Sequence, residues 1–557
     1  MNNMNKEENY SEWYNNIVRA ADIIDDRFPI KGMPVYKQYG YSIIRYILKE
    51  LEILLDNNGF YPSWFPNLIP YDIFKKESEH IKGFENEVFY VTPAKPVEEE
   101  RDIKYILRPT SETEMYYMFS LWIKSFRDLP LLTYMTNTVY RYETKATKPL
   151  IRGRELLWNE AHTAHRDLDD AILMINKSKE IYSNLFWNRL HIPHFWVKRP
   201  DWDKFAGADF TYAAETILPD GRFLQIGTTH LLGRNFSRAY DIIFEDEHPF
   251  IKIDKDTLEA YDQKNNKYLI NFEKNQITIK YIENNEIKLV YQFQEHNNGD
   301  INEGNKELMK DIENKIKSIF NNVELKKQKY VWQTSFGLSM RTLAALISIH
   351  GDNKGLILPF DIAPIQIIII PVYYSDEDKN KVIDYSIKIY NLLRDKYRVK
   401  IDFDDSKSPG WKFNNYELLG VPLRITIGKR EIEDASITIS IRMYNEKYYD
   451  FKADIDNLGN TIKKIIEIYE NKIIERAKNY LNNKIFKTNN VKDIENNLNA
   501  NIVFKAPFCM KEDCAENVKK NYSLDIRGTD INPETAEGKC IFCNNDARYY
   551  VYIGKSY

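Results

Sequence analysis

Apolar residues recur at helical spacing along residues 41–57, which predicts a long amphipathic helix with one buried face. Gly59 is expected to end this helix, because glycine readily adopts the left-handed backbone that follows many helix C-termini. The strand-like run 60–69 comes next and is interrupted by Pro62 and Pro66. Since proline cannot donate a hydrogen bond to a β-ladder, this run is predicted to lie at a sheet edge or an interface.

Two further strand-like runs, Val139–Glu143 and Glu155–His165, flank a polar loop. Arg141 and Glu143 occupy alternate positions, so their side chains are expected to leave the same strand face. Such a loop could close over a polyanion, and it could equally be a solvated hairpin tip. Its positive charges are Lys145, Lys148, Arg152 and Arg154.

The segment LRPTSETEMYYM predicts the start of another helix. Thr110 and Ser111 follow Pro109 and are suited to cap the helix N-terminus. Glu112 and Glu114 then fall in the first turn, where the helix dipole favours acidic side chains. This structural role accounts for all of these residues without any catalytic function.

A predicted helix at 168–190 is followed by strands across 194–244. In the sequence QIGTTHLLG, strand alternation places Gln225, Gly227 and Thr229 on one face, and His230 follows directly. Small residues on that face indicate close approach of a ligand or of another backbone segment. Taken alone, the histidine is better explained as a hydrogen-bonded core residue.

Residues 247–329 differ in composition from the rest of the chain and are rich in Asn, Lys and Glu. Short alternating runs separated by Asn-Asn pairs predict a small antiparallel sheet, and Lys306–Phe320 predicts a helix. We interpret this segment as an inserted surface module without recognisable chemistry.

Arg341 begins an apolar helix predicted to run from about Thr342 to His350. A buried charge without a partner costs several kcal/mol, so this guanidinium needs an acidic side chain or a bound phosphate. Chemistry alone favours the acidic side chain slightly.

Strands and helices alternate from residue 361 to residue 450, which predicts a compact α/β unit with a mixed sheet. A long helix is expected at Asn457–Asn483.

The chain has 557 residues, which is enough for roughly three or four domains. A net charge of −4 means that any nucleic-acid binding must use local basic patches. The longest apolar run, 365–372, is too short to cross a membrane. The first ten residues show no targeting pattern, so we expect a cytoplasmic protein that does not bind membranes.

All 4 cysteines lie in the last part of the chain, in the sequences CMKEDC and CIFC. Two close pairs in a cytosolic protein favour a tetrahedral zinc site over four unmodified thiols. A site closed by four thiolates would be structural. The expected ligands are Cys509, Cys514, Cys540 and Cys543.

These stretches together resemble a class II aminoacyl-tRNA synthetase, most closely a prolyl-tRNA synthetase of the archaeal and eukaryotic type. The three class II motifs are matched by GFYPSWFP with its Pro66, by RYE at 141–143 and by GLSMR at 337–341. Ser63 stands where the first motif usually has an apolar residue. The prolyl-type blocks are LRPTSET, LWNEAHTAH, KFAGADFT, QIGTTHLLGRNFS and HGDNKGLILP, and SPGWKFNNYELLGVPLR matches the anticodon-binding domain.

The resemblance implies an α+β fold. Residues 1–360 would form an antiparallel catalytic sheet flanked by helices, carrying the insertion 247–329. A mixed α/β anticodon-binding domain would span 361–450, and a C-terminal zinc-binding α/β domain would span 451–557. The resemblance also implies a homodimer that is formed through Pro66 and the helix before it.

The implied enzyme is a proline–tRNA ligase that uses ATP and Mg²⁺. It would form prolyl-adenylate from L-proline and then transfer the prolyl group to tRNA(Pro). The proline carboxylate is already ionised at neutral pH, so the first step needs placement and charge neutralisation rather than a general base.

By resemblance, Arg141 and Arg341 are the catalytic residues. The residues implied to bind ATP are Arg141, Glu143, Arg152, Gln225, Thr228, Ser339 and Arg341, with Gln225 also at the Mg²⁺. The residues implied to bind proline are Phe84, Thr110, Glu112, Arg141, Trp158, His162 and His230.

Two other functions remain open at this stage. One is a class II synthetase for a different amino acid, and the other is a non-catalytic tRNA-binding or regulatory relative. The presence of both Arg141 and Arg341 argues against the second, because such relatives usually lose the motif arginines.

Overall fold

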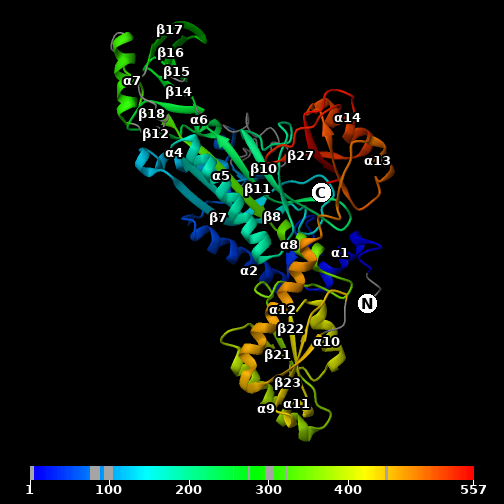
Figure 1. Ribbon diagram of the computed structural model, residues 1–557. Coiled ribbons are helices and arrows are strands. Elements are labelled where there is room, and N and C mark those ends of the chain that lie inside the picture. The colour runs from blue at the N-terminus through cyan, green and yellow to red at the C-terminus, as the bar shows by residue number, and fades with distance from the viewer. Residues whose placement is uncertain are drawn as a thin grey trace, which may run out of the picture.

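The computed structural model describes residues 5–75, 88–92, 105–254, 256–273, 276–294, 306–320, 323–445 and 449–557. Figure 1 shows an elongated molecule with a broad central sheet, a small sheet module at one end and a separate α/β unit at the other. The part of the chain that the structure describes holds no helix long and apolar enough to cross a membrane.

An eleven-stranded sheet forms the middle of the molecule, in the order β25-β26-β28-β27-β9-β10-β11-β19-β8-β7-β3. The pairs from β9 to β7 are all antiparallel, which confirms the antiparallel sheet implied by the sequence. The central strands are β7 (Leu131–Tyr140), β8 (Glu155–His165), β9 (Phe195–Lys198), β10 (Phe210–Ile217), β11 (Phe223–Gly233) and β19 (Trp332–Ser339).

Helices α2 (Gln38–Asp56), α5 (Leu168–Ser183) and α8 (Arg341–His350) pack beside this sheet (Figure 1). The predicted apolar stripe of α2 is buried, including Ile43, Ile47 and Leu51. Helix α5 continues into a π-helical turn, Asn184–Arg189. These side chains belong to one hydrophobic core that also includes Phe336 of β19.

The proline-interrupted run 60–69 forms two separate short strands rather than one. Strand β3 (Tyr61–Pro62) is the edge strand beside β7, as the prolines predicted. Strand β4 (Leu68–Pro70) belongs to a three-stranded sheet with β5 (Phe89–Val91) and β6 (Tyr105–Leu107). Proline blocks continuous pairing, so the chain changes sheets between the two strands.

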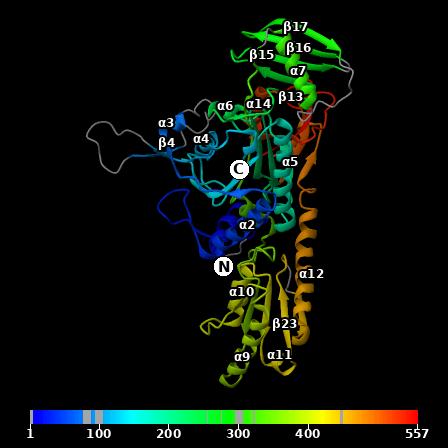
Figure 2. The same ribbon diagram turned by 90° about the vertical axis from the view of Figure 1, so that its left-hand side faces the viewer.

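The inserted segment forms the predicted small antiparallel sheet with one helix (Figure 2). It has its own core, which includes Phe250, Ile270 and Ile312. Its elements are β13 (Ile251–Asp254), β14 (Thr257–Tyr261), β15 (Lys267–Glu273), β16 (Gln276–Glu283), β17 (Glu286–Gln294) and α7 (Lys306–Ile319).

The segment from residue 361 forms the expected α/β unit around a mixed five-stranded sheet in the order β21-β20-β22-β23-β24. The first three of these strands are parallel and the others antiparallel. The elements are β20 (Ile367–Pro371), α9 (Asp376–Leu393), β21 (Val399–Ile401), α10 (Pro409–Leu418), β22 (Leu423–Ile427), α11 (Lys429–Glu433), β23 (Ser436–Ile441) and β24 (Tyr449–Asp454).

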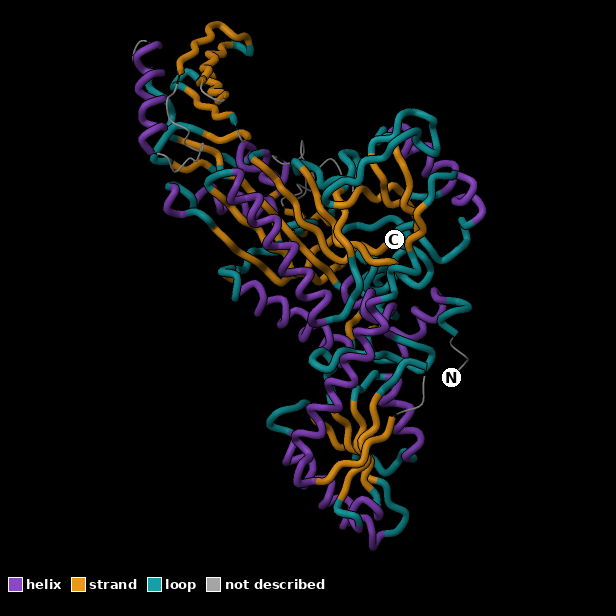
Figure 3. The backbone as a smooth tube through the Cα atoms, in the orientation of Figure 1, coloured by secondary structure: helices purple, strands orange, loops and turns teal. Residues whose placement is uncertain are grey.

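Helix α12 (Leu458–Lys478) runs from this unit back toward the central sheet (Figure 2). The C-terminal unit follows and joins the central sheet, because β27 pairs with β9 (Figure 3). Its elements are β25 (Ile485–Lys487), α13 (Val491–Asn496), β26 (Val503–Phe508), α14 (Glu512–Tyr522), β27 (Asp525–Asp530) and β28 (Tyr549–Gly554).

The remaining elements are short and connect these parts of the molecule. They are α1 (Tyr10–Ala20), β1 (Ile24–Asp25), β2 (Val35–Tyr36), α3 (Tyr71–Lys75), α4 (Glu112–Trp122), η1 (Phe126–Asp128), α6 (Asn235–Ala239), β12 (Ile243–Glu245), β18 (Gln328–Tyr330) and η3 (Ile455–Asn457).

Candidate active site

A cavity of about 270 Å³ opens on the central sheet over β8, β11 and β19. The structure brings together eight of the site residues expected from sequence in its wall: Thr110, Glu112, Arg141, Trp158, His162, Gln225, Thr228 and His230. The other lining residues are Glu160, Arg199, Asp203, Lys204, Phe205, Thr211, Ser335, Phe336 and Gly337. Phe84 lies outside the described residues.

Strand β7 ends at Tyr140, so Arg141 and Glu143 lie beyond it and the predicted common strand face is wrong. Arg141 is instead oriented by its Nε, which donates to the carbonyl oxygen of Pro109 at 3.0 Å. Its guanidinium lies 5.6 Å from the ring centroid of Trp158. The arginine is therefore held from two sides at the cavity wall.

Three arginines influence one another beside this cavity. Arg341 is half-buried, and desolvation followed by the positive charges of Arg141 and Arg152 lowers its pKa to about 10. Its Nε donates to the carbonyl oxygen of Ile151 at 2.9 Å. Within the described ranges Arg341 forms no ion pair with a carboxylate, so the acidic partner that the sequence allowed is not found there. A cluster of neighbouring guanidinium groups is suited to bind a polyanion.

Arg152, Glu143 and Ser339 lie outside the main cavity wall. Nε of Arg152 is 3.7 Å from Oε2 of Glu143, and the amide nitrogen of Arg341 donates to Oγ of Ser339 at 3.4 Å. Arg152 lines a second cavity of about 350 Å³ between the loop 141–154 and the C-terminal unit. Asp203 lines both cavities, which places them side by side.

Lys148 fastens the basic loop to both ends of the chain. Its Nζ lies within 5.3 Å of the ring centroids of Tyr10 and Tyr14 and 4.5 Å from that of Tyr557. The ammonium also donates to the Tyr557 hydroxyl at 2.8 Å. Cation–π contacts of this kind hold the loop in place, so this lysine is not available to a polyanion.

The floor of the cavity carries a buried acid–histidine cluster. Thr110 donates a hydrogen bond to Glu112, and Ser111 donates to Glu160. Ser111 occupies the N-cap position of α4, but its side chain does not cap the helix, so that prediction is wrong. The hydroxyl bonds Glu160 across the cavity floor instead, because that buried carboxylate needs donors.

The pKa values of Glu112 and Glu160 are shifted in opposite directions. Burial, and then the nearby Glu160, raise the pKa of Glu112. Burial also opposes ionisation of Glu160, but hydrogen bonds from His162, Ser111 and Asn137 outweigh it and lower its pKa. His162 shows the reverse balance: burial lowers its pKa, while Glu160 and Glu112 raise it above its usual value overall.

His230 belongs to the cavity and stays neutral. Burial, followed by the positive charges of His162 and Arg199, lowers its pKa to about 3. Its two ring nitrogens pair with hydroxyl groups, Nδ1 with Thr211 at 2.8 Å and Nε2 with Thr228 at 3.1 Å. The histidine is thus both hydrogen-bonded and exposed to the cavity, whereas the sequence offered these as alternatives.

Sequence reasoning missed Glu160, Arg199 and Phe205. Glu160 precedes His162 by two residues on β8, so strand alternation alone could have placed both on one face. No local sequence pattern identified Arg199 as a site residue, because its position beside Gln225 follows from the pairing of β9, β10 and β11. The centroid of the Phe205 ring lies 4.8 Å from that of the His230 ring, and Phe205 stands in the block KFAGADFT, which could have marked it.

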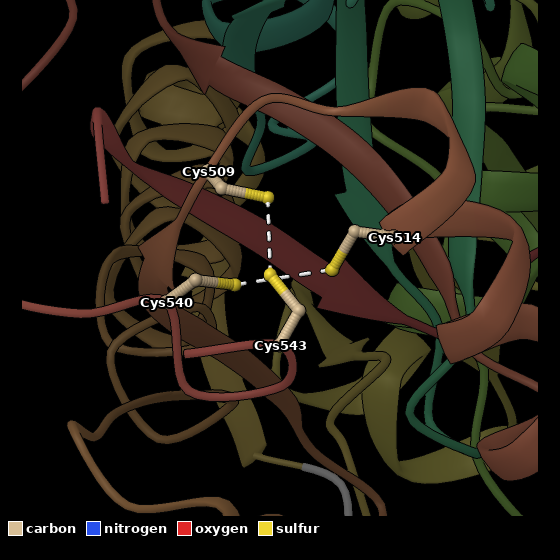
Figure 4. Close-up of side chains that lie close together, drawn as sticks. All are labelled: Cys509, Cys514, Cys540 and Cys543. Carbon is tan, nitrogen blue, oxygen red and sulfur yellow. Dashed lines mark hydrogen bonds between the residues drawn. The ribbon is translucent and has the colours of Figure 1, made fainter. Parts of the chain in front are cut away.

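The four cysteines form a second site in the C-terminal unit (Figure 4). Their sulfur atoms lie within 4.8 Å of one another, with Cys509 and Cys543 at 3.5 Å and Cys514 and Cys540 at 3.9 Å. Zinc with four thiolate ligands at 2.3 Å requires sulfur–sulfur distances of about 3.8 Å. The arrangement fits such an ion.

Three segments match known protein families. Residues 96–253 match the tRNA synthetase class II core domain (G, H, P, S and T), residues 366–465 the anticodon binding domain, and residues 491–557 the C-terminal domain of prolyl-tRNA synthetase. With the antiparallel sheet and the arginine-lined cavity, these matches define a class II aminoacyl-tRNA synthetase.

Full-length relatives narrow the class to one family. The chain is 48% identical to the proline–tRNA ligase of Nanoarchaeum equitans over 99% of both chains, and 35% identical to that of Pyrococcus abyssi over 99% of this chain and 98% of the relative. This chain belongs to the prolyl-tRNA synthetase family. The resemblance recognised in the sequence is therefore confirmed.

Solved structures agree with this assignment. The prolyl-tRNA synthetase of Giardia lamblia, in complex with prolyl-adenylate, superposes with a TM-score of 0.80 at 30% identity and covers 99% of both chains. The enzyme of Cryptosporidium parvum, complexed with L-proline and AMP, gives 0.77 at 27% identity and covers 99% of this chain and 96% of the other.

Proposed function

We propose that this chain attaches L-proline to tRNA(Pro) through prolyl-adenylate. The observation that carries the proposal is the cavity in which Arg141 lies beside a buried acid–histidine cluster and within the field of Arg341. This combination suits a small zwitterion next to a nucleotide triphosphate. Relatives named proline–tRNA ligase and a related structure complexed with prolyl-adenylate support it.

In the first step, a proline carboxylate oxygen bonds to the α-phosphorus of ATP and the bond to the β-phosphate oxygen breaks, releasing pyrophosphate. Arg141 holds the carboxylate and the α-phosphate together, since a planar guanidinium can donate to two oxygens at once. Negative charge builds up at the phosphorus, and fixed positive charge stabilises it.

Arg152 and Arg341 bind the outer phosphates, with Ser339 beside Arg341. Glu143 accepts a hydrogen bond from the adenine amino group. Magnesium, when bound, neutralises phosphate charge, and the side chains suited to hold its site are Gln225 and Thr228. Oε1 of Gln225 already accepts a hydrogen bond from Arg199 at 2.7 Å, so one oxygen lone pair remains for this role.

Thr110 and Glu112 accept hydrogen bonds from the secondary ammonium of proline. A cation beside Glu112 favours its ionised form and offsets the cost of burial. Trp158, His162 and His230 form the rigid wall around the ring. Trp158 is fixed because its Nε1 donates to Oδ1 of Asn137 at 2.5 Å.

The chain divides into three domains with different roles. We assign residues 1–360 to the catalytic domain, 361–450 to the domain that binds the tRNA anticodon, and 451–557 to a zinc-binding domain. In the last of these, the four cysteines hold Zn²⁺ as a structural ion. A homodimer through Pro66 and the preceding helix α2 is supported by two large side chains exposed between them, Tyr61 and Trp64, at 75% and 72% exposure. We expect the enzyme to work in the cytoplasm.

The deciding experiment is charging of tRNA(Pro) with radiolabelled proline, together with ATP–pyrophosphate exchange across a panel of amino acids. Proline alone is expected to support rapid exchange. Preference for another amino acid would identify a different synthetase. Binding of tRNA(Pro) without any exchange would identify a non-catalytic relative.

A further inference from the structure

Arg527, a residue of the C-terminal unit, reaches into the catalytic sheet. It lies on β27, and both its Nη2 and its Nε donate to Oε1 of Glu215 on β10, at 2.5 and 3.2 Å. Glu215 is completely buried. Its second oxygen, Oε2, has no hydrogen-bond partner among the described residues.

The same carboxylate oxygen also accepts from a cavity residue. Nη2 of Arg199 donates to Oε1 of Glu215 at 2.6 Å and to Oε1 of Gln225 at 2.7 Å. Nη1 of Arg199 is held by Asp203 at 3.0 Å. A continuous chain of hydrogen bonds therefore runs from Arg527 through Glu215 and Arg199 to Gln225.

Charge balance explains how Arg527 affects Gln225, at the other end of this series of hydrogen bonds. A buried carboxylate with a free oxygen attracts the nearest guanidinium into two parallel hydrogen bonds. Arg527 supplies part of the compensating charge, so Arg199 gives only one nitrogen to Glu215 and that nitrogen can also reach Gln225. Without Arg527, Arg199 would turn toward Oε2 of Glu215 and release Gln225.

The seam between the two units fixes the position of Arg527. Strand β27 pairs with β9 through Thr529 opposite Lys198. Gly528 has φ +124, and a Cβ there would lie 2.0 Å from the Lys198 carbonyl oxygen. Glycine is thus required for the close approach that brings its neighbour Arg527 to Glu215.

We propose that Arg527 is a positioning residue of the active site, which acts through Glu215 and Arg199 to orient the Gln225 carboxamide toward bound nucleotide. This inference rests on the proposed function. It makes the C-terminal unit a working part of the nucleotide site rather than an appendage.

The test is Arg527→Met in proline-dependent ATP–pyrophosphate exchange. The KM for ATP is expected to rise about tenfold, while the KM for proline changes by less than about twofold. In the double variant with Gln225→Ala, the increase in KM for ATP should be no larger than in Gln225→Ala alone, because both substitutions disrupt the same contact. The full chain is used, and its metal content and melting temperature are measured for each variant.

Lys487→Met is the matched control, since Lys487 of the same C-terminal unit pairs with Glu534 at 2.6 Å and lines neither cavity. Its KM for ATP is expected to equal that of the unaltered chain. If Arg527→Met fails to fold, Arg527→Gln is measured instead, because glutamine also removes the compensating charge while its amide can still donate a hydrogen bond to Glu215.

An unchanged KM for ATP in a folded Arg527 variant would overturn the proposal, and so would a loss fully additive with Gln225→Ala. Absence of exchange by the unaltered chain would contradict the proposed function instead. The two failures are therefore distinguishable.

Discussion

Nε2 of His162 lies 3.2 Å from Oε2 of Glu160, and both side chains are buried beneath the candidate proline site. The pair raises the pKa of the histidine and lowers that of the acid. Its contribution to stability should therefore depend on pH in a defined way.

Because the folded-state pKa of His162 is raised, its contribution is fully present below the unfolded value of 6.5 and is lost as pH rises through the folded value. The melting temperature of His162→Gln should thus fall furthest below that of the unaltered chain near pH 5.5, and the gap should narrow above pH 6.5. Thermal melts across this range measure it. A gap that widens with rising pH would contradict the ion pair.

Arg141→Ala should lower kcat/KM for proline-dependent ATP–pyrophosphate exchange by about a thousandfold, since it removes fixed positive charge from the reacting phosphorus. The fold should remain intact, as judged by the melting temperature. Arg141→Lys is the matched control and should recover only a small part of the activity, because lysine cannot donate two parallel hydrogen bonds. Near-normal exchange by a folded Arg141→Ala variant would remove this residue from the mechanism.

Cys540→Ser should abolish the metal content of the purified chain, because a tetrahedral site of four thiolates loses one ligand. Metal analysis of the unaltered chain is expected to give about one zinc per chain. The variant should melt at a lower temperature, and a chelator should lower the melting temperature of the unaltered chain toward the same value. If the metal-free chain melted at the same temperature as the metal-loaded chain, the four thiols would stabilise this unit without a metal ion.

Arg442→Met should strongly destabilise the chain. Arg442 forms a completely buried ion pair with Asp352 at 2.5 Å, which ties the end of α8 to the α/β unit. Removing one partner of such a pair costs about 3–5 kcal/mol, because the other charge stays buried. Lys452→Ala is the control: it breaks an exposed pair with Asp434 and should change stability by less than about 1 kcal/mol. Urea denaturation measures both, and equal effects would contradict this account.

Periodic elements were predictable because their signal is local. The buried stripe of α2, the β8 run Glu155–His165 and the helix at 341–350 all follow from which side chains repeat at periods of about 3.6 or 2. The spacing of four cysteines likewise predicted a cluster that the fold brings within 4.8 Å. Prolines correctly marked β3 as an edge strand.

The errors have a common cause, which is that long-range contacts decide side-chain roles. Ser111 has the sequence position of a helix cap, yet it bonds Glu160, which is 49 residues away. Lys148 belongs to a basic loop, yet three tyrosine rings from the two ends of the chain surround it. No local pattern encodes either partner.

By itself, the sequence predicted many of the helices and strands, the cysteine set and eight of the residues around the cavity, because each follows from spacing or from a motif. Only the tertiary structure decided that Arg527 of the C-terminal unit shares Glu215 with Arg199. The physical reason is that a buried charge is stabilised by whichever groups the fold places beside it, however distant they are along the chain.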